Sequence, residues 1–422
     1  MKTLDAKMAE IVDKRQAVLK KLCIELVQAK SENPPGDVSE AACVVEQFLT
    51  EEGINCQTFE PEKGHKNVIA TIGKGEPSLI LCGHIDVVPS GDIKKWSVDP
   101  YKGEIRQGKL CGRGATDMKG GVAAMLMALT AAKEYENQLA GKVTVATVSD
   151  EEAQGPGGAL WLLKNKKLTG DMCLITEPTS YLSEKYSIVG GERGTCWLKI
   201  IATGKPAHGS IPALGENAIE MLTRFLPKLK ALEKETVKTP KDAETLIRNG
   251  EEELRKIAKK QDIPANRLTK TLTHYTVNIG KISGGTKTNV VPEKCEAELD
   301  IRVPAGGHPN GVEEFISCML PEKLEHQVIN KTMPSYTPAN HPLIKAVQKS
   351  AQKVLGYRPA ATHMAATTDA HHFRELLGIP AATFGPGYLD LAHAYDEFIY
   401  LKDVKNAAKI HADIIASIVD ER

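Results

Sequence analysis

Histidine and carboxylate side chains follow several short apolar runs of this sequence, at the point where each run ends. Imidazole nitrogens and carboxylate oxygens together bind divalent cations, so a metal site is the chemistry that these residue types suggest. A single His-x-Asp pair is more often a surface feature, and paired glutamates often begin a solvated helix. The repetition after successive runs is the stronger signal. The residues are His84 and Asp86 after Leu79–Cys82, Glu151 and Glu152 after Lys142–Val148, Glu177 after Met172–Ile175, and His393 after Ala381–Phe384.

The elements that must position these side chains follow from apolar periodicity. These four short apolar runs, and a fifth at Asn67–Ile72, are expected to be strands. Segments with apolar residues at helical spacing separate the runs, so the chain is expected to form an α/β sheet with helices on its faces. Ligands of open α/β sheets bind beyond the carboxyl ends of the strands, where the side chains should converge. The expected helices are Ile11–Val27, Val38–Leu49, Val122–Ala132, Ala159–Leu163, Leu343–Val354 and Val404–Ile418.

A different pattern occupies the middle of the chain. The expected order there is strand, helix, strand, strand, helix, which is typical of a small ferredoxin-like α+β domain. We therefore predict a first domain built from residues 1–191 and 337–422, with residues 192–336 inserted into it. The charged segment 233–270 is predicted to be a solvated helical excursion. The expected elements are Thr195–Thr203, Asn217–Leu232, His274–Ile282, Lys294–Val303 and Val312–Leu320.

Composition excludes several classes of protein. The 422 residues are 41% hydrophobic and 26% charged, and 54 basic residues balance 54 acidic ones, so no basic excess indicates nucleic-acid binding. No apolar run is long enough for a membrane span, and the N-terminus lacks the apolar core of a signal peptide. The nine cysteines include no C-x-x-C pair, which favours neither a disulfide framework nor a thiolate zinc site. We expect a cytoplasmic protein.

Longer motifs resemble one family, the dinuclear zinc amidohydrolases and peptidases that include acetylornithine deacetylase, succinyl-diaminopimelate desuccinylase, aminoacylase and carboxypeptidase G. The motifs occur in the order of that family and span nearly the whole chain. No G-x-S-x-G elbow or phosphate-binding loop competes with them. The resemblance implies a zinc-exopeptidase-like catalytic domain with a mixed sheet and an inserted lid. The motifs are Asn33–Gly36, His84–Pro89, Leu110–Gly121, Gly191–Gly194 and Ala392–Glu397.

The resemblance also implies how two Zn²⁺ ions per subunit would be held, with Co²⁺ able to replace zinc. His84 and Glu177 would bind one ion, and Glu152 and His393 the other. Asp117 would bridge the two ions. A shared carboxylate suits this position because it offsets the repulsion between two dications about 3.5–4 Å apart.

Two further residues receive roles from the same resemblance. Asp86 would orient His84 by accepting its second ring N–H. Glu151 would be the general base that takes a proton from the attacking water. The adjacent glutamates would then divide the work, because Glu152 binds metal while Glu151 moves a proton.

The inserted domain carries the remaining predicted residues. His208 resembles the histidine of the family's lid, which donates a hydrogen bond to the oxyanion of the reaction. Asn289 and Arg302 match lid positions that bind the substrate carboxylate, a task that suits the guanidinium fork. In the related enzymes the lid also dimerises and its histidine reaches the neighbouring subunit's site, so a homodimer is expected.

The predicted function is metal-dependent hydrolysis of the amide bond of an N-acyl amino acid, with N-acetylornithine or N-succinyl-diaminopimelate as leading substrates. The alternatives are a dipeptidase or carboxypeptidase on the same scaffold, or a catalytically silent binding homologue. All seven expected positions are retained, namely the five metal ligands, the base Glu151 and Asp86, which argues against a silent homologue. Neither the acyl group nor the physiological metal follows from the sequence. His371 and His372 are interpreted as ordinary polar residues rather than as lining of the leaving-amine pocket.

Overall fold

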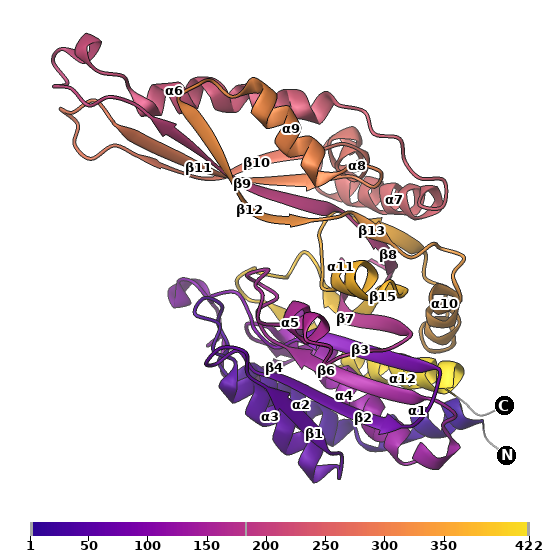
Figure 1. Ribbon diagram of the computed structural model, residues 1–422. Helices are drawn as coiled ribbons and strands as arrows, with labels where there is room; N and C mark the ends of the chain where they lie inside the picture. Colours follow the sequence, from indigo (N-terminus) through magenta and orange to yellow (C-terminus); the bar gives the residue numbers. More distant parts are fainter. Residues whose placement is uncertain (1–2, 182–183, 420–422) are drawn as a thin grey trace. The chain divides into compact units, whose positions relative to one another are not determined.

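The structure is a computed structural model that describes residues 3–181 and 184–419, and the chain forms two compact units (Figure 1). Unit 1 contains the described residues up to Gly190, Thr337–Ala361 and those from Thr368 onward. Unit 2 contains Gly191–Tyr336 and the short segment Thr362–Thr367, which the sequence analysis assigned to the other domain. The expected α/β fold with a mixed sheet and an inserted α+β domain is confirmed.

The sheet of unit 1 has the strand order β1-β2-β6-β3-β7-β15-β8. It is mixed, because β3, β6, β7 and β15 pair in parallel while β1, β2 and β8 pair antiparallel to their neighbours. The parallel strands are nearly continuous apolar runs, as expected for strands covered on both faces. The strands in this order are β1 Cys56–Phe59, β2 Asn67–Gly73, β3 Ser78–His84, β6 Lys142–Val148, β7 Met172–Ser180, β8 Ile188–Glu192 and β15 Ala381–Tyr388. Two short strands, β13 Ser335–Tyr336 and β14 Ala361–Met364, also pair with β8.

Helices cover both faces of this sheet. On one face, Leu162 of α5 and Phe373 after α11 pack on Ile80 and Cys82 of β3. On the other, α4 and α12 contact the sheet and each other. Helix α4 is apolar all round and buried along almost its whole length, as that composition requires. The helices are α1 Leu4–Lys14, α2 Gln16–Gln28, α3 Ser39–Glu51, α4 Gly120–Lys133, α5 Ala159–Lys164, α10 Pro342–Leu355, α11 Ala370–His372 and α12 Leu401–Val419.

One expected helix of unit 1 is divided. The predicted helix Ile11–Val27 is wrong, because α1 ends at Lys14 and α2 begins at Gln16. Arg15 leaves the helical conformation between them, with φ −101° and ψ 19°. Its guanidinium pairs with both carboxylate oxygens of Glu52 at the end of α3, a contact that apolar periodicity cannot reveal.

A small antiparallel sheet brings two distant loops of unit 1 together. Its strand order is β16-β5-β4, and Phe398 pairs with Cys111. The chain that precedes β16 therefore lies beside the chain that follows β5, which joins the loop of His393 to the loop of Asp117. The bounds are β4 Glu104–Arg106, β5 Lys109–Cys111 and β16 Phe398–Tyr400.

Unit 2 is a four-stranded antiparallel sheet, in the order β10-β11-β9-β12, with helices on one face. The order of elements is that of a ferredoxin-like domain, and it includes β12, which the sequence analysis missed. The predicted helix Asn217–Leu232 stops being α-helical at Phe225, because Pro227 lacks an amide hydrogen and a tighter helical turn follows. The bounds are β9 Gly194–Thr203, α6 Ala218–Phe225, α7 Glu244–Lys260, α8 Ala265–Thr273, β10 Thr276–Gly284, β11 Lys294–Val303, α9 Pro309–Met319 and β12 Leu324–Thr332.

Helices α7 and α8 make up most of the charged segment 233–270, while residues 235–240 of that segment are not helical. A search of the described helices finds none with the length and apolar character that crossing a membrane requires.

Candidate metal centre

His84 stands at the carboxyl end of β3 and is almost fully buried, with 1% of its surface exposed. Its Nδ1 lies 2.9 Å from the main-chain oxygen of Asp86, which can only accept a hydrogen bond. Nδ1 therefore carries a hydrogen, so Nε2 is the nitrogen that has a lone pair when the ring is neutral. That nitrogen lies 3.2 Å from Asp117 Oδ1 and 3.9 Å from Glu151 Oε2. This tautomer is the one in which Nε2 can bind a metal ion.

His393 faces the other carboxylate oxygen of the same aspartate. Its Nε2 lies 3.5 Å from Asp117 Oδ2 and 3.1 Å from Glu152 Oε2. The two carboxylate oxygens of Asp117 thus each face one histidine. A carboxylate with one oxygen directed to each of two nitrogen ligands is suited to bridge two ions.

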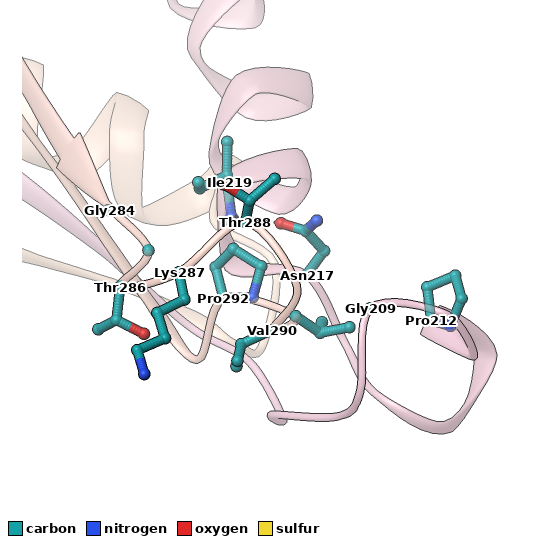
Figure 2. A pocket seen from close by; sticks show the side chains of 12 residues that line it. Gly209, Pro212, Asn217, Ile219, Gly284, Thr286, Lys287, Thr288, Val290 and Pro292 are labelled. Carbon is teal, nitrogen blue, oxygen red and sulfur yellow. Dashed lines mark hydrogen bonds between the residues drawn. The ribbon is translucent and has the colours of Figure 1, made fainter.

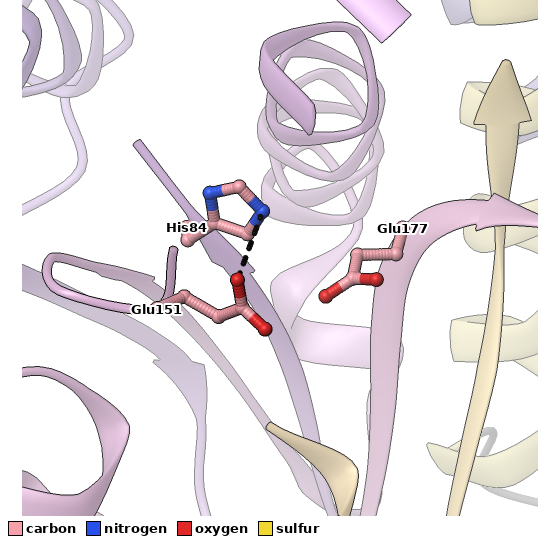
Figure 3. Close-up of side chains that lie close together, drawn as sticks. All are labelled: His84, Glu151 and Glu177. Carbon is pink, nitrogen blue, oxygen red and sulfur yellow. Dashed lines mark ion pairs between the residues drawn. The ribbon is translucent and has the colours of Figure 1, made fainter. Parts of the chain in front are cut away.

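The remaining donors complete one cluster (Figure 3). The side chains of His84, Glu151 and Glu177 point toward one another, and their donor atoms lie within 4.8 Å of one another. His84, Asp117 and Glu152 form a second group that meets the same limit. Nitrogen and oxygen donors at these separations fit divalent cations such as Zn²⁺.

The crowding of carboxylates in this cluster shifts the pKa values of several of its members. Burial and the charge of Glu177 raise the pKa of Glu151 well above its usual range, and burial and the charge of Asp117 raise the pKa of Glu152. Hydrogen bonds to Asp117 and Glu152 raise the pKa of His393 to about 10. Glu151, Glu152 and His393 thus bind protons more tightly than usual, and bound cations would displace these protons.

Asp117 keeps its negative charge in this cluster. Burial raises its pKa, but hydrogen bonds from the two histidines outweigh burial and hold the pKa below its ordinary value. For His84, burial lowers the pKa. Its hydrogen bond to Asp117 and the charges of the nearby carboxylates outweigh burial and raise the pKa of His84 well above the usual range. A carboxylate that stays ionised therefore lies between the two imidazoles.

Asp86 holds the cluster in a way that differs from the expectation. The ring N–H of His84 is taken by the main-chain oxygen of Asp86, and the carboxylate lies 3.6 Å away. That carboxylate instead accepts the backbone N–H groups of Glu151 at 3.3 Å and Glu152 at 3.1 Å. Asn33 donates to the same carboxylate at 2.9 Å. Asp86 thus fixes both the imidazole and the loop of the two glutamates.

The sequence analysis gave no role to Asn33 or to Glu397, although both stand in motifs that it quoted. Asn33 also donates to Asp150 at 3.1 Å and so ties together two buried carboxylates. Glu397 accepts hydrogen bonds from the loop that carries Asp117. These contacts join residues far apart in the chain, and the sequence contains no local signal for them.

His208 belongs to unit 2 and is exposed. The backbone N–H of Ser210 donates to its Nδ1 at 3.1 Å, so the hydrogen of the neutral ring is on Nε2. The neighbouring segment contains Asn289, whose carbonyl oxygen accepts the N–H of Gly209 at 2.8 Å. These two segments border a cavity of about 540 Å³ within unit 2, lined by Gly209, Pro212, Asn217, Ile219, Gly284, Gly285, Thr286, Lys287, Thr288, Val290, Val291 and Pro292 (Figure 2).

Arg302 of unit 2 has its guanidinium partly engaged. Asp300 accepts from its Nε at 2.8 Å and from a terminal nitrogen at 3.1 Å, and Thr367 accepts from the other terminal nitrogen at 3.2 Å. The adjacent Arg193 is buried, and burial together with the charge of Arg302 lowers its pKa to about 9. Any substrate carboxylate at Arg302 would share this guanidinium with Asp300.

The two histidines interpreted as ordinary polar residues lie in unit 1. The ring centroids of His371 and His372 lie 3.7 Å apart with the ring planes tilted by 45°, and His371 Nδ1 lies 2.6 Å from the main-chain oxygen of Thr368. Burial lowers the pKa of His372 to about 2. The ring of His372 is therefore held neutral, and the interpretation of the two histidines stays a prediction.

Comparison with known proteins gives the family. The model of the peptidase family M20/M25/M40 matches residues 80–417, and the chain belongs to this family of hydrolases. A probable succinyl-diaminopimelate desuccinylase of Staphylococcus epidermidis is 27% identical over 418 residues, which cover 95% of this chain and 98% of that protein.

Solved structures share the fold. The M20 family metallo-carboxypeptidase Sso-CP2 from Sulfolobus solfataricus matches with a TM-score of 0.80 at 23% identity, over 93% of this chain and 97% of that one. The di-peptidase Dug1p from Saccharomyces cerevisiae matches with a TM-score of 0.79 at 16% identity, over 97% and 98%. The fold of an M20 hydrolase is therefore established for this chain.

Proposed function

We propose that this protein hydrolyses the amide bond of an N-acyl amino acid with the help of two divalent metal ions, preferentially Zn²⁺. The observation that carries the proposal is the convergence of two imidazoles and four carboxylates on one centre. The metal ligands are His84, Asp117, Glu152, Glu177 and His393. In this assignment Asp117 is shared by both ions, in agreement with its two oxygens facing different histidines.

When bound, two divalent ions lower the pKa of a water molecule and polarise the amide carbonyl. Glu151 takes one proton from the attacking water, whose oxygen then bonds to the carbonyl carbon. The same side chain returns that proton to the amide nitrogen as the C–N bond breaks. The products are a carboxylate and an amine, and no acyl-enzyme forms.

His208 donates a hydrogen bond from Nε2 to the oxyanion of the tetrahedral intermediate. Its tautomer supports this role, because Ser210 occupies Nδ1 and leaves the hydrogen on Nε2. Donors that are oriented before the reaction stabilise developing charge without reorganisation. Asn289 and Arg302 bind the substrate carboxylate from the same unit.

The preferred substrate is an N-succinyl or N-acetyl amino acid, with N-succinyl-diaminopimelate and N-acetylornithine the leading examples. The similarity to the staphylococcal desuccinylase along almost the full chain supports the first. A dipeptidase or carboxypeptidase activity is the second candidate, since the solved structures that share the fold include both.

We also propose a homodimer with composite sites and a cytoplasmic location, with neither nucleic acid nor membrane as a partner. Strand β10 lies at the edge of its sheet and exposes Ile279 and Ile282. An edge strand with exposed apolar side chains is normally covered by another chain or element. His208 is exposed in the same unit, so its imidazole is accessible to the active site of a neighbouring subunit.

A substrate panel tests the proposed function. Purified protein with added Zn²⁺ or Co²⁺ is given succinyl, acetyl and dipeptide substrates, and the amine released is measured. We expect the highest kcat/KM on an N-acyl amino acid with a negatively charged acyl chain. A preference for dipeptides would select the second candidate, and inactivity on all of them despite two bound ions would contradict both.

A further inference from the structure

Glu397 and Arg113 form a buried ion pair beside the proposed metal centre, outside every role assigned above. Arg113 Nη1 lies 2.7 Å from Glu397 Oε2, and the exposed surface is 2% for Arg113 and 0% for Glu397. Each residue is four positions from a proposed ligand: Arg113 precedes Asp117, and Glu397 follows His393. Both loops belong to unit 1.

Glu397 holds the loop of Asp117 by its backbone. Its carboxylate accepts the N–H groups of Gly114 at 3.0 Å, Thr116 at 2.8 Å and Asp117 at 3.1 Å. Its own carbonyl oxygen accepts the N–H of Gly112 at 2.9 Å. One buried carboxylate thus fixes most of the loop that ends at the aspartate.

Arg113 holds the loop of His393 in the reciprocal way. Its Nη1 donates to the carbonyl oxygen of Ala394 at 3.2 Å, next to the histidine. The guanidinium also lies over the ring of Trp96, with 5.1 Å between its carbon and the ring centroid. The side chain is therefore packed on one face and bonded at its edge, which leaves it little freedom to turn.

We propose that Glu397 and Arg113 are positioning residues that couple the loop of Asp117 to the loop of His393, so that these two ligands meet the metal at a fixed separation. Glu397 accepts hydrogen bonds from the backbone of the Asp117 loop, and Arg113 donates one to the backbone of the His393 loop. Loss of either set of hydrogen bonds would change the distance between Asp117 and His393 without removing a metal-binding atom. This inference rests on the proposed function, because it takes Asp117 and His393 to be metal ligands.

The test measures Zn²⁺ binding directly, by competition with a chelating dye, rather than activity. Residues that orient metal ligands typically change metal affinity by about 10–100-fold when substituted. We expect Glu397→Gln to weaken Zn²⁺ binding by about this factor, because an amide NH₂ faces N–H donors where a carboxylate oxygen accepted them. Arg113→Met should weaken it similarly, and the double variant should be no weaker than the worse single variant.

Asp413→Asn is the matched control. Asp413 is also a buried carboxylate of unit 1, bonded to Ser350 and at 2.6 Å to Lys353, but it contacts neither ligand loop. If general loss of a buried ion pair were the cause, this variant would lose Zn²⁺ affinity as well, and the inference would be wrong. Arg113→Lys keeps the charge without the fork and should give an intermediate affinity.

Two results separate the inference from the function on which it rests. A wild-type protein that binds no Zn²⁺ contradicts the proposed function itself. A wild-type protein that binds two ions, with Glu397→Gln folded and equal to it in affinity, contradicts only the coupling. If Glu397→Gln does not fold, Arg113→Lys carries the same test, and unchanged affinity there overturns the inference.

Discussion

The two groups of proposed active-site residues are held in very different ways. In unit 1 the imidazole of His84 is buried and both of its nitrogens face polar atoms at 3.2 Å or less. In unit 2 the imidazole of His208 is exposed, and its Nδ1 contacts the hydroxyl and the backbone N–H of Ser210, two residues away. The imidazole of His84 is fixed by contacts between distant parts of the chain, and the imidazole of His208 by contacts to a neighbouring residue.

This difference follows from what each group has to do. Metal ligands must keep a set geometry in the resting protein, so the fold surrounds them with hydrogen-bond partners. A donor to the oxyanion is needed only when substrate is bound, and an exposed side chain can reach a substrate or a neighbouring chain. The comparison predicts that changes at the proposed metal ligands of unit 1 alter metal binding and catalysis together, while changes in unit 2 alter catalysis alone.

Metal removal is expected to have the largest effect. Dialysis against a chelator should abolish hydrolysis, and Zn²⁺ should restore it. Hydrogen exchange should show faster exchange of amides in residues 84–87, 112–119 and 150–152, because the ligands then lose their common partner. The strands β9–β12 of unit 2 should be unchanged. Full activity in protein shown to contain no metal would end this assignment.

Glu151→Gln should lower kcat by about 10²–10⁴-fold, the usual contribution of a general base. The amide has nearly the same shape as the carboxylate but cannot accept the proton. Bound metal, measured by elemental analysis, should stay at two ions per chain.

Glu152→Gln is the matched variant at the adjacent position. It should lose part of the metal instead, because its carboxylate lies 3.1 Å from His393 and shares that ion. Equal metal content in the two variants, whether full or reduced, would contradict the division of roles between the neighbouring glutamates.

Much of the fold could be predicted from the sequence, because long apolar runs have a clear periodicity. The bounds of β6 and β11 agree with the predicted strands Lys142–Val148 and Lys294–Val303. The missed strands are short or alternate between exposed and buried positions without a strong apolar run, as in β4 and β12. Their pairing depends on neighbours that only the folded chain supplies.

The candidate site was predictable to the extent that its residues follow strands. His84 ends β3, Glu177 lies within β7 and Glu151 follows the end of β6, so the sheet itself brings them together. The main-chain contact of His84 and the links through Asn33 and Glu397 depend on distances between remote segments. No periodicity or composition encodes such contacts.

His208→Ala should lower kcat by about 10²–10³-fold, the cost of losing one oriented oxyanion donor. Metal content should remain at two ions per chain, in contrast to the ligand variants of unit 1. Ser210→Gly is a graded control, because it removes the hydroxyl beside Nδ1 but keeps the backbone N–H. It should lower kcat much less.

Subunit exchange tests whether His208 acts on a neighbouring chain. Mixed dimers of His208→Ala with Glu151→Ala should recover part of the activity. The His208→Ala chain keeps its metal centre and base, and its partner supplies the imidazole. If exchange is demonstrated by size and labelling and no activity returns, His208 works within its own chain or has another role.

The smallest effect is expected at Arg302. Truncating one member of a buried charge pair typically costs about 2–5 kcal/mol, and the low end applies because Asp300 already occupies two of the guanidinium nitrogens. Arg302→Ala should therefore lower kcat/KM for an N-acyl amino acid by about 30-fold, which corresponds to about 2 kcal/mol. The α-amide of the same substrate, which lacks the carboxylate charge, should lose much less. Arg224→Ala removes an exposed guanidinium from the same unit and should leave both substrates unaffected. Equal losses on the acid and the amide would show that Arg302 does not bind the substrate carboxylate.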